Sequence, residues 1–232
     1  PAYAIPLRLV GSEMCIRDRS LRSRQYETDC FKDIFIEKME QGANWVAAPK
    51  PRLLDSMYQR EDLSKITLNN HEPVFDAANI LRCNNDILYL VSNTGNLKGA
   101  KWLQNFLGSE YRVHTIEDVY SYIHIDSTIA VLREGLCLLN PERVNESNMP
   151  KFLKSWDKIW CPPMVDIGYH QTIRASLWIG VNLLSVDENT VIDDLASELS
   201  LIGAKSNLNG DTLPNIDEFT AEWDIFYIPL YY

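Results

Sequence analysis

Long apolar runs are missing from this 232-residue chain, and none approaches the roughly 18 residues that a membrane-spanning helix needs. Basic residues are also in deficit: 22 Lys and Arg stand against 32 Asp and Glu, and the net charge of −10 argues against a nucleic-acid binder. The five cysteines form no C-x-x-C pair and no regular framework. They therefore favour a reducing, cytoplasmic setting over a disulfide-stabilised secreted fold.

The ends of the chain do not share the patterning of its middle. Residues 13–19 resemble a translated sequencing-library adaptor, so we expect residues 1–19 to be an artefact and not part of a fold. The alternatives for this segment are a real N-terminal arm or a signal peptide. Residues 192–232 are expected to be a divergent or frameshifted tail. The folded segment is then residues 20–191.

Hydrophobic periodicity predicts helices alternating with strands over this segment, which is typical of the α/β class. An apolar stripe at three- and four-residue steps predicts a helix over residues 21–41, closed by Gly42. The other expected helices are 97–107, 150–156 and 192–199. The expected strands are 86–91, 111–116, 122–129, 136–139 and 158–161.

The most informative pattern lies in residues 122–129. His124 and Asp126 are two residues apart on the expected strand, so their side chains should point to the same side. The hairpin that follows leads to Arg143, whose planar guanidinium suits a carboxylate. A proton donor, an acid that binds a guanidinium and a base that binds a carboxylate together suggest chemistry on an amino acid such as arginine.

A second polar cluster lies in residues 72–79. Asp76 and Asn79 are expected in a tight turn whose small alanines let a backbone pass close to a ligand. Plainer alternatives stay open, because this turn can be solvated surface and His124 can be a structural histidine. His124 with Asp126 can also be half of a metal site, but a His-x-Asp pair alone is weak evidence, and no metal is expected.

Six short motifs occur in order along residues 20–191. They are Trp45–Pro51 (WVAAPKP), Glu72–Ala78 (EPVFDAA), Tyr111–His114 (YRVH), His124–Thr128 (HIDST), Asn140–Arg143 (NPER) and Ser176–Trp178 (SLW). Together they resemble the family of glycine amidinotransferases and inosamine-phosphate amidinotransferases. The resemblance implies that residues 20–191 are the central part of the catalytic domain. Residues 144–150 lean toward the bacterial inosamine-phosphate branch.

The resemblance implies both a fold and a reaction. The fold would be an α/β-propeller of five pseudosymmetric ββαβ modules around a central channel, here incomplete. The reaction would transfer the amidino group of arginine to an acceptor amine, such as glycine or an aminocyclitol-type amine, through a cysteine-bound intermediate. No cofactor and no nucleic-acid or membrane partner is expected. The implied partners are the small-molecule substrates, and a homodimer is one expected oligomeric state.

The resemblance also implies roles for individual residues. His124 matches the family's general acid and base, and Asp76 matches the acid that works with it. Four positions match substrate-binding residues, with Asp126 on the guanidinium and Arg143 on a substrate carboxylate; the other two are Ser176 and Asn79. Asn79 departs from the acid of glycine-specific relatives, which leaves the acceptor amine open.

The cysteine nucleophile does not match. The family carries it in a Gly-Gly-x-Phe-His-Cys stretch near the C-terminus, and this sequence contains no such stretch. Cys30, Cys83, Cys137 and Cys161 are expected to be small buried hydrophobes instead. We therefore expect this 232-residue chain to be inactive. The alternatives are a guanidine hydrolase resembling arginine deiminase and a non-catalytic guanidino-binding fragment.

Overall fold

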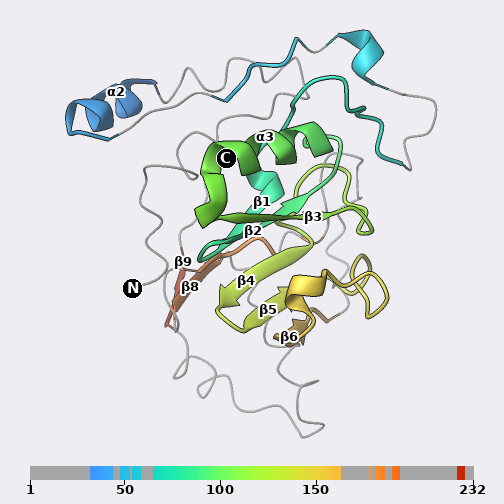
Figure 1. The fold of residues 1–232 in the computed structure, drawn as a ribbon. Coiled ribbons are helices and arrows are strands. Elements are labelled where there is room, and N and C mark those ends of the chain that lie inside the picture. The colour runs from blue at the N-terminus through green and yellow to red at the C-terminus, as the bar shows by residue number, and fades with distance from the viewer. Residues whose placement is uncertain are drawn as a thin grey trace, which may run out of the picture. The chain divides into compact units, whose positions relative to one another are not determined.

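The computed structural model describes residues 32–43, 48–52, 54–58, 65–162, 178, 181–185, 190–193 and 224–227. The chain divides into two compact units, one ending at His124 and the other beginning at Ile125. Strands β1 to β3 belong to the first unit, and strands β4 to β9 belong to the second (Figure 1). The described 3₁₀ helices are η3 (Asp55–Met57), η4 (Ala77–Asn79), η5 (Gly108–Glu110) and η6 (Lys151–Leu153).

A three-stranded sheet forms the centre of the first unit. Strand β1 (Ile80–Cys83) pairs antiparallel with β2 (Asp86–Leu90), and β2 pairs parallel with β3 (Arg112–Ile116). A parallel pair requires a crossover connection, which is helix α3 (Leu97–Leu107). The middle strand β2 buries successive side chains on both faces, as its continuous apolar run predicts.

Helix α3 has specific caps at both ends, which explains why it matches its predicted bounds. The Asn96 side chain accepts a hydrogen bond from the Gly99 N–H (2.9 Å), and Gly108 follows the last turn with φ of +70°. The buried helix residues that pack in one core with the β2 side chains of Ile87 and Tyr89 are Ala100, Leu103 and Leu107.

The first sheet of the second unit repeats the same pairing order. Strand β4 (Ile129–Arg133) pairs antiparallel with β5 (Leu136–Leu139), and β5 pairs parallel with β6 (Asp157–Trp160). The hairpin turn between β4 and β5 uses Gly135 at φ of +81°, a left-handed conformation that glycine adopts without steric penalty. Helix η6 lies in the crossover to β6, where the sequence predicted a longer helix over residues 150–156.

A third sheet has this order again, with β7 (Leu184–Ser185) antiparallel to β8 (Thr190–Asp193) and β8 parallel to β9 (Asp224–Tyr227). The described residues thus show three sheets with one pairing scheme, which sequence self-similarity was too weak to reveal. The predicted helix over residues 192–199 is wrong at its start, because Ile192 and Asp193 lie in β8. The rest of that prediction falls outside the described residues.

The predicted strand over residues 122–129 is also wrong. His124 lies in an irregular segment, residues 126–128 form a turn, and strand β4 begins only at Ile129. The turn is closed by the Thr128 N–H, which donates to the Ile125 carbonyl at 2.8 Å. Alternation of apolar and polar residues resembles a strand in sequence, but no strand partner pairs with residues 122–128 in the described structure. Strand β1 was not predicted at all.

Helix α2 (Lys32–Glu40) ends where Gly42 was expected to close it. Gly42 has φ of +89°, and the Ala43 N–H donates to the Lys38 carbonyl at 2.9 Å, as in a Schellman cap. The predicted apolar stripe is only partly confirmed: Phe35 is buried, whereas Ile34 and Met39 are exposed. Burial of such a stripe depends on the element that packs against it, which periodicity along one helix does not specify.

None of the helices in the described ranges is both long enough and apolar enough to cross a bilayer.

Candidate active site

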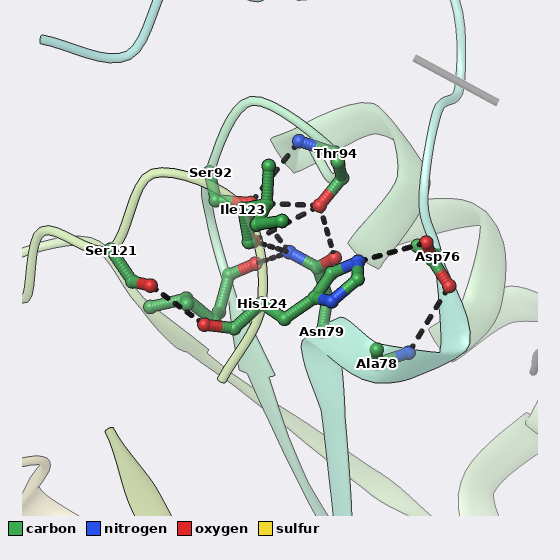
Figure 2. A network of polar contacts seen from close by, with 9 residues as sticks. Asp76, Ala78, Asn79, Ser92, Thr94, Ser121, Ile123 and His124 are labelled. Atoms are coloured by element: carbon green, nitrogen blue, oxygen red, sulfur yellow. Dashed lines mark hydrogen bonds and ion pairs between the residues drawn. The ribbon is translucent and has the colours of Figure 1, made fainter. Parts of the chain in front are cut away.

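Asp76 is held at the start of helix η4 with both of its carboxylate oxygens engaged (Figure 2). Its backbone is extended, and its Oδ1 accepts a hydrogen bond from the Ala78 N–H at 3.2 Å, which caps the 3₁₀ helix. Its Oδ2 lies 3.1 Å from Nε2 of His124. The residue is only 3% exposed, so this carboxylate is directed at the imidazole and not at bulk solvent.

His124 comes 48 positions later in the chain, and only the fold brings it to Asp76. Its side chain is 17% exposed, and its own carbonyl accepts a hydrogen bond from the Ser121 hydroxyl at 2.7 Å. Because an ionised carboxylate only accepts hydrogen bonds, we assign the proton of this contact to Nε2. Nδ1 is then the basic nitrogen of the neutral ring. A histidine oriented by an acid in this way can accept and return a proton.

Asn79 lies beside this pair and is fully buried. Its Nδ2 lies 2.9 Å from the Leu90 carbonyl, 2.7 Å from Ser92 Oγ and 3.2 Å from the Ile123 carbonyl, and its Oδ1 accepts from the Thr94 hydroxyl at 2.6 Å. Protein groups therefore contact both ends of the amide. The predicted substrate-binding role of Asn79 stays a prediction. The structure adds a second role, because the Asn79 amide joins several segments of the first unit through hydrogen bonds.

The second unit holds the predicted cation. Arg143 follows β5 in a turn, and its Nη1 donates to Ser127 Oγ at 2.8 Å and to Thr128 Oγ1 at 2.9 Å. Two hydroxyls thus orient one edge of a planar guanidinium that is partly buried. Asp126 lies in the turn just before these two residues and is partly exposed. Ser176 falls outside the described residues.

The described cysteines are Cys83, Cys137 and Cys161, and all three are buried. Burial raises the pKa of Cys137 to about 12, and nearby Lys158 opposes this only in part. A thiol with such a pKa is almost entirely protonated at neutral pH and is a poor nucleophile. Cys30 lies outside the described part of the chain. In that part, no group of three or more His, Cys, Asp or Glu is placed to hold a metal ion.

Sequence reasoning missed Ser92 and Thr94, which bond to Asn79. A signal was available, because the buried strand β2 is followed at once by Ser92-Asn93-Thr94-Gly95-Asn96, a polar run of which four members are buried polar residues. Buried polar side chains need hydrogen-bond partners, so a polar run directly after a core strand indicates a network and not a solvated loop.

Relatives of one kind share much of this sequence. Inosamine-phosphate amidinotransferase 1 of Streptomyces glaucescens is 46% identical over 209 residues, covering 90% of this chain and 60% of that protein. The mitochondrial glycine amidinotransferase of Gallus gallus is 31% identical over 222 residues, covering 89% of this chain and 52% of that protein. This chain is homologous to these amidinotransferases. No family model matches it.

A solved structure agrees with the sequence relatives. The inosamine-phosphate amidinotransferase StrB1 of Streptomyces griseus matches with a TM-score of 0.74 at 46% identity, covering 84% of this chain and 56% of that one. The resemblance drawn from the six motifs is therefore confirmed. The chain spans between half and two thirds of the length of these amidinotransferases.

More distant structures share the fold alone. The N-terminal domain of ArgZ, an arginine dihydrolase, matches with a TM-score of 0.58 at 15% identity. The α/β class is confirmed by the described sheets and by the amidinotransferase structure.

Proposed function

We propose that this chain is the central part of an amidinotransferase that moves the amidino group of arginine to an acceptor amine. Homology supports the transferase class, and the observation that carries the catalytic assignment is the contact between His124 Nε2 and Asp76 Oδ2 at 3.1 Å. These two residues are far apart in sequence, and short motifs alone assigned them to one acid–base pair. Their contact is what that assignment requires.

In the proposed reaction a cysteine thiolate attacks the guanidinium carbon of arginine, and the bond from that carbon to the ornithine nitrogen breaks. Nδ1 of His124 first takes the proton of the thiol, gives it to the departing ornithine amine, and later takes one from the incoming acceptor amine. That amine attacks the same carbon and displaces the thiolate. Asp126 binds the guanidinium, and Arg143 binds the substrate carboxylate.

The thiolate in this scheme belongs to a cysteine that is not among the 232 residues of this chain. The raised pKa of Cys137, caused first by its burial, and the burial of Cys83 and Cys161 support this part of the proposal. We expect no ornithine when this chain is mixed with arginine and glycine. Formation of ornithine would overturn the assignment of the nucleophile, and formation of citrulline would favour a hydrolase instead.

We also propose that the repeated sheets are modules of a five-module α/β-propeller. The shared antiparallel-then-parallel pairing of the three sheets supports this. Ser176 and Asn79 remain proposed substrate contacts. Glycine and an aminocyclitol-type amine are both proposed as acceptors. A cytoplasmic setting and a homodimer remain predictions from the sequence.

Arginine binding tests the substrate assignment without requiring turnover. We expect the chain to bind L-arginine more tightly than agmatine, which keeps the guanidinium but lacks the carboxylate. Arg143→Lys should weaken arginine binding about tenfold, because lysine cannot form the two-pronged contact, and should leave agmatine binding unchanged. Isothermal titration calorimetry measures all four affinities.

Arg133→Lys provides the matched control, because Arg133 lies in β4 of the same unit and is exposed. It should bind both ligands as the unmodified chain does. Equal weakening of arginine and agmatine by Arg143→Lys would contradict the carboxylate assignment. Absence of arginine binding at millimolar concentration would contradict the proposed substrate.

A further inference from the structure

The carbonyl oxygen of Ile123, the residue immediately before His124, is surrounded by three buried side chains. Ser92 Oγ makes a very short contact with it, Thr94 Oγ1 lies 3.0 Å away, and Asn79 Nδ2 lies 3.2 Å away (Figure 2). All three of these residues are 0% exposed. One backbone carbonyl beside a proposed catalytic residue thus receives an unusual concentration of buried polar groups.

The number of available protons determines which of these three groups donates to the Ile123 carbonyl. Ser92 Oγ is approached by two donors, Asn79 Nδ2 at 2.7 Å and the Thr94 N–H at 3.1 Å, so its two lone pairs are filled. Its single hydroxyl proton has two possible acceptors, the Ile123 carbonyl and Thr94 Oγ1 at 3.1 Å, and we assign it to the carbonyl because that oxygen is the closer one. The second Asn79 Nδ2 proton goes to the Leu90 carbonyl at 2.9 Å, and the Thr94 hydroxyl donates to Asn79 Oδ1 at 2.6 Å.

Under this assignment every side-chain donor in the network has one acceptor, and no proton is used twice. The assignment also follows the shortest contact of each hydroxyl. Ser92 is therefore the residue that fixes the Ile123 carbonyl, while Asn79 and Thr94 set the direction of its proton. A buried network with all of its members satisfied has one arrangement and resists change.

The other side of His124 is held in the same way. The carbonyl of His124 itself accepts from the hydroxyl of Ser121, a residue that is 3% exposed, at 2.7 Å. The peptide planes before and after His124 are thus each anchored by a serine hydroxyl. Because these two planes define the backbone dihedrals of His124, only its side-chain torsions remain, and the Asp76 contact restrains those.

We propose that Ser92, oriented by Asn79 and Thr94, is a positioning residue that holds His124 in register with Asp76. This inference rests on the proposed function in one respect only, namely that His124 is the acid and base. The segment around His124 is irregular and lacks the hydrogen bonds of a sheet, so side chains supply the order that a strand would have supplied. Ser92 touches no reacting atom in this scheme and acts through the backbone.

Nitrogen NMR of the histidine rings in the full chain tests the proposal. In the unmodified protein, His124 should show one neutral tautomer with the proton on Nε2. Ser92→Ala removes the hydroxyl, and the His124 ring signals should move toward the average of the two tautomers. The ring signals of His71 and His114 should stay in place, and His124→Gln assigns the signal.

Two variants separate positioning from general damage. Thr94→Ser keeps the hydroxyl that orients Asn79 and should preserve the His124 spectrum. Thr67→Val removes a buried hydroxyl of the same unit that bonds to Asn93 Oδ1 at 3.0 Å, and it should also leave the His124 signals unchanged. If Ser92→Ala does not fold, Ser121→Ala serves instead, because it frees the second peptide plane and should shift the same signals.

Unchanged His124 signals in a folded Ser92→Ala or Ser121→Ala variant would overturn the inference. An equal shift in Thr67→Val would overturn it too, because the effect would then not be specific to the Ile123 carbonyl. Arginine binding is measured on the same samples. Absence of arginine binding in the unmodified chain would contradict the proposed function while leaving this spectroscopic result intact.

Discussion

The first sheets of the two units have the same strand pairing but carry different chemistry after their middle strand. In the first unit, β2 leads into Ser92 and Thr94, which belong to a closed network of neutral side chains. In the second unit, β5 leads into Asn140 and Arg143, and the guanidinium is held through one edge by two hydroxyls. The same strand pairing is thus followed by a hydrogen-bonded network of neutral side chains in one unit and by an oriented guanidinium in the other.

The two units also differ in the crossover connection between their parallel strands. In the first unit the crossover is α3, a capped helix packed on the sheet, whereas in the second it is irregular and contains only η6. A packed helix buries the loop at its start, so polar groups there must be satisfied internally. We expect the first unit to be the more sensitive of the two to loss of single polar atoms.

The largest difference is expected between two matched asparagine variants. Asn79→Ala should lower the free energy of unfolding by about 3 kcal/mol, because it leaves several buried partners unsatisfied. Asn140→Ala should cost about 1 kcal/mol, since Asn140 donates to the Ser127 carbonyl at 3.0 Å and accepts from the Glu142 N–H at 2.9 Å. Urea denaturation measures both, and equal losses would contradict the comparison.

Two glycine variants, one in each unit, test the same comparison with smaller expected effects. A Cβ on Gly99, inside α3, would lie 2.7 Å from the Tyr89 hydroxyl and closer still to the Val74 carbonyl oxygen. Gly99→Ala should therefore destabilise by about 2 kcal/mol, although alanine usually favours helices. Gly135→Ala meets no atom within 4 Å and should cost about 1 kcal/mol for its positive φ. Thermal unfolding of both variants gives the ranking, and a stabilised Gly99→Ala would contradict the close packing.

The Tyr89 hydroxyl, which is fully buried, predicts a smaller effect. It lies 3.1 Å from the Val74 carbonyl and 3.0 Å from the Asn96 carbonyl, so Tyr89→Phe should cost about 1 kcal/mol. Its pKa is raised well above the usual value by burial and then by the charge of Asp76. Tyr111→Phe is the control, because the Tyr111 hydroxyl has only a partly buried contact with Arg82, and its urea midpoint should not move.

The smallest effect concerns the ion pairs of Asp86 with Arg112 and His114. Burial tends to raise the pKa of Asp86, but hydrogen bonds from His114 and Arg112 outweigh it and lower this pKa below 3.8. When folding lowers the pKa of a carboxyl group, that group stabilises the protein at any pH above its pKa in the unfolded chain. This stabilisation disappears as the pH falls through the pKa of the folded state. Asp86→Asn should therefore cost about 0.5 kcal/mol at pH 7 and nothing once the pH is well below 3.8. A difference in unfolding free energy that persisted in acid would contradict this account.

Local sequence patterns were sufficient wherever local physics decides the structure. Helix α3 matched its predicted bounds because Asn96 caps its first turn and Gly108 ends its last. Strand β5 also matched its predicted bounds, residues 136–139. The predicted strand through His124 failed because periodicity does not show whether a partner strand pairs with the segment.

In the candidate site, too, motifs assigned some residues, whereas the roles of others depend on the tertiary structure. His124 and Asp76 were assigned from motifs, and Asn79 was expected to contact substrate. The motifs did not indicate that the Asn79 amide joins segments of the protein through hydrogen bonds, or that Ser92 and Thr94 belong to this network. Those roles depend on buried hydrogen bonds between segments up to 44 residues apart, which no spacing rule along the chain describes.

The sequence by itself indicated the resemblance to the amidinotransferases and the α/β class, and its motifs pointed to His124 and Asp76 as the proposed acid–base pair, because these are carried by short motifs and local periodicity. Only the tertiary structure decided that His124 sits in an irregular segment and not in a strand, and that serine hydroxyls anchor the peptide planes on both of its sides. The physical reason is that a buried carbonyl must find a donor somewhere. Which donor it finds is settled by packing in three dimensions.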